Sequence, residues 1–169
     1  MLAGTRFLVV LALMVAWLAP SAQAQGTSYI ARDHLVVDLR HGVEWLRCTV
    51  GQVWDGTSCT GEVVRLNHEQ IEIAITQANE QLGDGWRLPT LDELEGLLCE
   101  NCEVFSYSEP RAMIDSGIFP ATEAEPYWTS QKNRLSSGHY FSVNFFNGWT
   151  YGRFLASQPL AVRLVRDRR

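Results

Sequence analysis

The chain has 169 residues and a formal net charge of −5, with 46% hydrophobic and 20% charged residues. Its length suits one domain with a single core. An acidic surface repels polyanions at long range, so nucleic acid is not expected as a partner. A small basic group at the C-terminus is interpreted as a solvated tail; it contains Arg163, Arg166, Arg168 and Arg169.

The first 24 residues have the organisation of a cleavable secretory signal. Arg6 is followed by an apolar stretch over residues 7–19, and Pro20 ends it. The Ala-x-Ala pattern at residues 22–24 predicts cleavage before Gln25. A spanning helix needs about 20 apolar residues, so a retained membrane anchor is the less favoured alternative.

Cleavage of residues 1–24 would leave about 145 residues with a net charge of about −6, because Arg6 is the charged residue lost. The remaining chain has no second apolar run long enough to cross a bilayer, so no membrane span is expected after cleavage. We therefore expect a periplasmic or secreted protein.

The four cysteines are Cys48, Cys59, Cys99 and Cys102. In an oxidising compartment, an even number of cysteines predicts two disulfides. Three pairings are open, and Cys48–Cys59 with Cys99–Cys102 is favoured. A redox role for the C-x-x-C pair is disfavoured, because the pair is expected at a helix C-terminus among acidic residues, which raises thiol pKa values. A zinc site is disfavoured because Cys48 and Cys59 are too far apart for a knuckle.

The first half of the mature chain predicts strands and then helices. Residues 25–34 predict a loose leader and residues 35–169 a single domain. Strands are expected at residues 35–39 and 43–48, before a turn-rich loop over 49–62.

Two helices follow. Asn67 is the expected N-cap of the first helix, with Gln70 in capping-box position, and Gly83 ends the helix. The second helix opens with the box Thr90-x-x-Glu93, and its apolar face is Leu91, Leu94, Leu97 and Leu98.

In the second half of the chain, the hydrophobic pattern changes to the two-residue alternation of strands. An irregular segment over 104–126 precedes expected strands at 127–130, 140–146 and 160–165. Between the last two, Asn147-Gly148 predicts a hairpin turn leading into residues 149–154. Helices separated from an antiparallel sheet predict the α+β class.

No catalytic or metal-binding constellation is apparent. The four histidines, His34, His41, His68 and His139, are dispersed without metal-ligand spacing. The acidic residues Asp92, Glu93 and Glu95 are interpreted as complements of a helix N-terminus. Trp86 and Arg87 are interpreted as structural. We expect no enzymatic activity, no metal and no cofactor.

The hairpin after Asn147 carries the candidate ligand-binding residues Trp149, Tyr151 and Arg153. Two aromatic side chains at i and i+2 with a cation nearby can stack on a sugar or a peptide. The same pattern also fits an ordinary half-buried strand, so both interpretations stay open. The loops at 104–126 and 131–139 are expected to complete the recognition face.

Several segments together resemble the bacterial Lcl C-terminal domain-like family. They are VEWLRCTVGQVWDGTSCTGE (43–62), GWRLPTLDEL (85–94), IFP (118–120), YWTS (127–130), VNFFNGWTYGRF (143–154) and AVRLVR (161–166). The resemblance covers roughly residues 35–167. It implies a C-type-lectin-like or formylglycine-generating-enzyme-like fold, in which two helices precede a twisted antiparallel sheet and the N- and C-terminal strands pair.

The resemblance also implies limits on activity. The enzyme branch of this fold uses reactive cysteines in its C-terminal half, whereas this chain has no cysteine after Cys102. The leading hypothesis is an exported binding module for an unknown carbohydrate or protein ligand. The alternatives are an envelope enzyme with an unrecognised site and a structural subunit of an envelope assembly.

Overall fold

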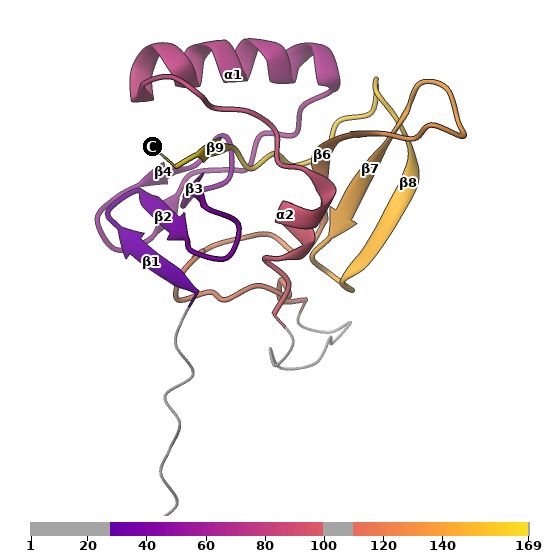
Figure 1. Ribbon diagram of the computed structural model, residues 1–169. Helices are drawn as coiled ribbons and strands as arrows, with labels where there is room; N and C mark the ends of the chain where they lie inside the picture. The colour runs from indigo at the N-terminus through magenta and orange to yellow at the C-terminus, as the bar shows by residue number, and fades with distance from the viewer. Residues whose placement is uncertain (1–27, 100–109, 169) are drawn as a thin grey trace, which may run out of the picture.

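The computed structural model describes residues 28–99 and 110–168 (Figure 1). The expected signal at residues 1–24 and Cys102 lie outside these residues. Along the described chain, five strands precede two helices and four further strands. They are β1 (Tyr29–Arg32), β2 (Leu35–Asp38), β3 (Val43–Leu46), β4 (Val53–Trp54), β5 (Cys59–Thr60), α1 (His68–Leu82), α2 (Leu91–Glu95), β6 (Pro126–Lys132), β7 (His139–Asn144), β8 (Trp149–Leu155) and β9 (Val165–Asp167).

The strands form two larger antiparallel sheets and a small hairpin. One sheet has the order β1-β2-β3-β9, the other has the order β6-β7-β8, and β4 pairs with β5. The last strand, β9, lies beside β3, whereas β1 is at the opposite edge of the same sheet. Helices apart from antiparallel sheets place the protein in the expected α+β class. Neither described helix is long and apolar enough to cross a bilayer.

The two helices begin where the sequence predicts. Asn67 and Thr90 are the N-caps, and each forms a complete capping box with the residue three positions on. Such a box satisfies two backbone N–H groups that the helix itself leaves unpaired. Gly83 ends α1, and its φ of 86° is a conformation that favours glycine.

The second helix is shorter than its apolar pattern predicts. It ends at Glu95, and Leu98 forms a β-bridge with Ile114 instead of continuing the helix. The ring of His41 lies against Gly96, where an added Cβ would be 2.3 Å from its Cε1 atom. Leu97 is nevertheless buried in the core. The spacing of the leucines therefore predicts their burial correctly, but it overestimates the length of the helix.

The N-terminal segment also differs from expectation. Residues 25–34 were expected to be a loose leader, but Tyr29–Arg32 form β1 and pair with β2. Asp33 has a φ of 53° at the tight turn between the two strands. Aspartate tolerates this left-handed conformation better than most residues. Because β1 is mostly exposed, it lacks the hydrophobic alternation by which strands are recognised.

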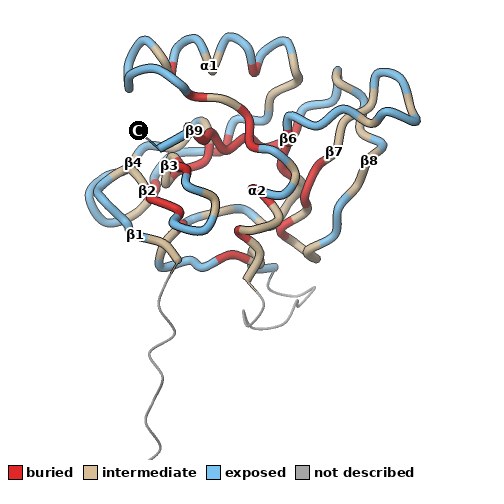
Figure 2. The backbone as a smooth tube through the Cα atoms, in the orientation of Figure 1, coloured by how far each residue is buried: buried red, intermediate tan, exposed pale blue. Residues whose placement is uncertain are grey.

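The core consists of two clusters divided by the segment 160–165. Leu160, Val162 and Leu164 belong to the cluster beneath α1. Ala161 and Val165 belong to the other cluster, between the sheets and α2. The alternation expected for a strand is therefore present, although β9 itself begins only at Val165. Figure 2 shows this buried segment and the largely exposed outer surface of α1.

Candidate ligand-binding site

The three cysteines among the described residues are disulfide-bonded. Cys48 and Cys59 are bonded to each other, as the favoured pairing predicts, and this bond closes the loop that carries β4. Cys99 is disulfide-bonded as well, and it lies four residues beyond the end of α2. The described residues include no free cysteine. No thiol in this part of the chain is therefore free for nucleophilic or redox chemistry.

The Arg of the W-R-L-P-T motif holds chain segments together. Arg87 donates hydrogen bonds to both carboxylate oxygens of Glu93, each at 2.9 Å, and a third to Asp167 at 2.6 Å. The Glu93 bonds outweigh desolvation and raise the pKa of Arg87. Glu93 also accepts the backbone N–H of Thr90 in the capping box. The motif thus links the start of α2 to β9, in agreement with the structural interpretation.

The interpretation of the C-terminal arginines as a solvated tail is wrong for two of them. Arg163 is fully buried and donates to the carbonyls of Leu46 and Arg47 and to the hydroxyls of Thr49 and Thr122. Burial lowers its pKa to about 10. The alternation of this segment points Arg163 inward, where carbonyl and hydroxyl oxygens take the place of a carboxylate partner.

Arg166 is the second internal arginine of the presumed tail. Its guanidinium lies 4.6 Å from the ring centre of Trp86 and forms an ion pair with Glu44 at 2.8 Å. Trp86 is itself buried. The contact joins β9 and β3 to the segment after α1, so Arg166 also has a structural role.

Two of the three predicted ligand-binding residues lie together on the sheet β6-β7-β8. The ring centres of Trp149 and Tyr151 are 6.4 Å apart. Trp149 is 66% exposed, whereas Tyr151 is half-buried and its hydroxyl accepts a hydrogen bond from Asn147. The pair is the outer end of a longer series, the aromatic row: Trp149, Tyr151, Phe154, Trp128, Tyr140 and His68.

The aromatic row connects the exposed hairpin to the core. From Tyr151 to Phe154 and from Phe154 to Trp128, the ring centres are 6.3 and 6.0 Å apart. Trp128 is fully buried, and its indole N–H donates to the carbonyl of Leu66. Successive edge-to-face contacts limit the movement of each ring. The exposed Trp149 is therefore supported from behind by rings fixed in the core.

Arg153 occupies an irregular position in β8. Ser142 pairs with Tyr151 and Tyr140 pairs with Phe154, so Gly152 and Arg153 together face one residue, Phe141. An added Cβ on Gly152 would be 2.7 Å from the Phe141 ring, which explains the glycine. This bulge breaks the alternation that placed Arg153 on the face of Trp149 and Tyr151. Arg153 is exposed.

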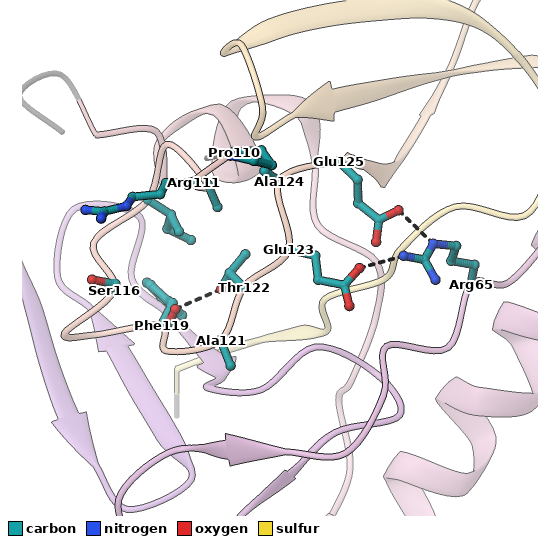
Figure 3. Close-up of a pocket in the computed structure, with 12 residues that line it drawn as sticks. Arg65, Pro110, Arg111, Ser116, Phe119, Ala121, Thr122, Glu123, Ala124 and Glu125 are labelled. Carbon is teal, nitrogen blue, oxygen red and sulfur yellow. Dashed lines mark hydrogen bonds and ion pairs between the residues drawn. The ribbon is translucent and has the colours of Figure 1, made fainter. Parts of the chain in front are cut away.

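A second feature, the loop pocket, is a hollow of about 840 Å³ lined by residues of the segment 110–125 and by Arg65. Figure 3 shows Glu123 and Glu125 pointing to the same guanidinium. Arg65 donates to Glu123 at 2.6 Å and to Glu125 at 2.7 Å. The two acids are next-but-one neighbours in sequence, but Arg65 is about 60 residues away, so no local sequence pattern predicts this group.

Glu125 is the more buried of the two acids. Burial raises its pKa above the ordinary value, although Arg65 acts in the opposite direction. Its second oxygen, Oε1, is buried without a hydrogen-bond partner among the described residues. Such a carboxyl group keeps its proton to a higher pH than an ordinary glutamate does. The hollow therefore contains one unusual acid, neutralised in part by a shared arginine.

The histidines and acids do not assemble into a metal site in the part of the chain that the structure describes. The Nδ1–H of His41 donates to the buried carboxylate of Asp38 at 2.7 Å. That carboxylate also accepts backbone N–H groups of the β2–β3 turn, from Arg40 and His41. The Asp38 carboxylate therefore stabilises the β2–β3 turn and has a structural role.

A comparison with sequence models of protein families shows to which family the chain belongs. A sequence model of the Lcl C-terminal domain matches residues 34–166. The chain belongs to this family. The matched region contains the aromatic row and the loop pocket. A comparison with curated proteins gives no match.

Three arginines within the segments that resemble this Lcl C-terminal domain have structural roles. Arg87, Arg163 and Arg166 each join segments that are distant in sequence. A binding site must instead be sought among other residues, of which the exposed Trp149 and its half-buried neighbour Tyr151 are the most distinctive.

Proposed function

We propose that this Lcl C-terminal domain is an exported, non-enzymatic binding module that captures a carbohydrate or protein ligand through Trp149 and Tyr151. The observation that carries the proposal is the exposure of Trp149 at the end of a row of rings anchored in the core. An aromatic residue held in place before binding loses little side-chain entropy when a ligand stacks on it. Exposed Trp and Tyr are also common binding anchors.

The surroundings of the pair supply polar groups. Asn147 donates to the Tyr151 hydroxyl at 3.0 Å, which fixes both side chains at the turn. Arg153, two residues after Tyr151 in the chain, adds an exposed cation at the bulge. An apolar ring surface with hydrogen-bonding groups at its edge suits either a sugar ring or an aromatic-rich protein surface.

The family and the disulfide support the wider proposal. We assign the domain a C-type-lectin-like fold with paired N- and C-terminal strands, and the position of β9 beside β3 in the N-terminal sheet supports this assignment. The Cys48–Cys59 disulfide favours a periplasmic or secreted location, reached through a signal at residues 1–24 that is then removed.

The loop pocket favours a second candidate, an envelope enzyme with Glu125 as an acid or base. Its raised pKa is the observation in support. However, Glu123 and Glu125 share one arginine, and a pair of catalytic carboxylates normally flanks its substrate with separate roles. Binding through the exposed aromatic pair is therefore the better-supported function.

The test compares the double variant W149A/Y151A with the wild-type protein on a glycan array and on immobilised envelope proteins. We expect ligand retention to fall at least tenfold, because the stacking surface is removed. Leu135→Ala is the control, since Leu135 is 99% exposed and lies outside the aromatic row. Thermal unfolding checks that all variants fold. Undiminished retention by the double variant would contradict the proposal.

A further inference from the structure

A separate groove lies between α1 and the loop that the Cys48–Cys59 disulfide closes. Its volume is about 740 Å³, and every residue that lines it belongs to the described part of the chain. It shares no residue with the aromatic row or with the loop pocket. Nothing in the proposed hairpin site requires this groove.

The groove exists because α1 is narrow where it faces the loop. Ala74 and Ala78 are one turn apart on this side of the helix, so the helix leaves space above its apolar floor of Leu46 and Leu164. The facing wall is the loop 48–56, which the disulfide closes across 11 residues. The hydrogen bonds from Thr57 and Ser58 to Asp55 fix the tip of that loop. The groove is therefore preformed.

The polar groups on the helix side are two amides. Gln77 and Gln81 lie one turn apart on α1, both exposed and both lining the groove. Neither side chain forms a hydrogen bond to another described residue. An amide offers a donor and an acceptor side by side, which matches the adjacent hydroxyl groups of a sugar.

The loop side contributes an aromatic ring. Trp54 lines the groove, and the guanidinium of Arg47 lies 4.0 Å from its ring centre. Arg47 in turn donates to the carbonyls of Gly117 and Ile118. The indole is thus held in position, as a stacking surface must be before a ligand arrives.

The charges in the groove disfavour an anionic ligand. No lysine or arginine lines it, whereas Asp33 and Asp55 do. A hydrogen bond from His34 lowers the pKa of Asp33, and backbone hydrogen bonds from Ser58 and Thr57 lower that of Asp55. Both acids are therefore ionised at neutral pH, and they disfavour anionic ligands by repulsion.

We infer that this groove is a second ligand site, which binds an uncharged saccharide of one or two pyranose rings. The apolar floor and Trp54 take the C–H faces of the sugar, and Gln77 and Gln81 bind its hydroxyl groups. A volume of about 740 Å³ accommodates a ligand of this size. This inference does not depend on the hairpin site.

The test titrates four neutral disaccharides, cellobiose, maltose, lactose and N,N′-diacetylchitobiose, into ¹⁵N-labelled mature protein. We expect at least one to shift amide signals in residues 49–56 and 74–82. The double variant Q77A/Q81A should weaken that binding at least tenfold. The matched control E72A/E80A also introduces two alanines on the exposed surface of α1, but outside the groove, and should bind as the wild type does.

Two further measurements separate this inference from the proposed function. W149A/Y151A should leave binding in the groove unchanged, whatever its effect on the hairpin ligand. Titration with a sulfated disaccharide should give weaker shifts than its neutral parent. The inference is overturned if none of the four sugars binds, if the shifts map to the hairpin, if Q77A/Q81A binds normally, or if the sulfated sugar binds better.

Discussion

His68 shows how one residue's protonation is set by its neighbours. Its ring stacks on Tyr140 with 3.6 Å between centres and contacts Trp128 edge-on at 4.7 Å. Its Nε2 atom is buried without a hydrogen-bond partner among the described residues. Burial and, secondarily, the charge of Lys132 lower the pKa of His68 below 6.5. The folded protein therefore favours the neutral ring of His68, at the end of the aromatic row opposite Trp149.

This lowered pKa predicts a pH dependence of stability. In the unfolded chain His68 takes up a proton near pH 6.5, whereas in the folded chain it does so only at lower pH. The stabilisation is thus complete above pH 6.5 and is lost as the pH falls through the folded pKa. We expect the unfolding free energy to decrease from pH 7 to pH 5 in urea titrations. His68→Phe should reduce this slope, whereas His34→Gln, on the exposed turn, should keep it. Equal slopes in all three proteins would contradict the assignment.

At the scale of elements, the start of α1 determines how one wall of the groove is built. Asn67 accepts the N–H of Gln70 at 2.9 Å, and the Gln70 side chain accepts the N–H of Asn67 at 3.0 Å. Only Ile71 and Ala78 of α1 are buried, so the helix depends on local interactions more than a helix packed on a broad face does.

Asn67→Ala should therefore lower the unfolding free energy by about 1 kcal/mol, because Ala cannot cap the helix. Asn67→Asp is the matched control, since aspartate caps as well as asparagine and its charge suits the helix N-terminus. Chemical denaturation of both variants measures the difference. An alanine variant as stable as the aspartate variant would show that the cap contributes nothing.

At the scale of the whole molecule, the segment 160–165 joins the two core clusters. Its residues alternate between the cluster beneath α1 and the cluster between the sheets. Arg163 lies at the centre and bonds to the end of β3 and to the loop residue Thr122. Phe119 lies 4.9 Å from its guanidinium. One side chain thus connects the N-terminal sheet to the loop before β6.

Arg163→Ala should lower the unfolding free energy by about 3 kcal/mol or more, because it leaves a cavity and buried carbonyl groups without donors. Arg163→Lys should also destabilise, since an ammonium cannot reach the same four acceptors. Arg153→Ala, at an exposed position, should change stability by no more than about 0.5 kcal/mol. Equal effects of the alanine substitutions at Arg163 and Arg153 would contradict the bridging role.

The sequence by itself determined the features that depend on neighbours in the chain. The N-caps Asn67 and Thr90, the strands of the second sheet, and the alternation within residues 160–165 are all legible from local patterns. The family also follows from the sequence, since the matched region spans residues 34–166.

The tertiary structure decided what depends on residues far apart in the chain. It ended α2 at Glu95, placed Arg163 in the core, and brought Arg65 to Glu123 and Glu125. It also formed the bulge that separates Arg153 from the predicted aromatic pair. The physical reason is the same in each case: local backbone preferences select helices and turns, but contacts between distant segments decide where those elements stop and which side chains meet.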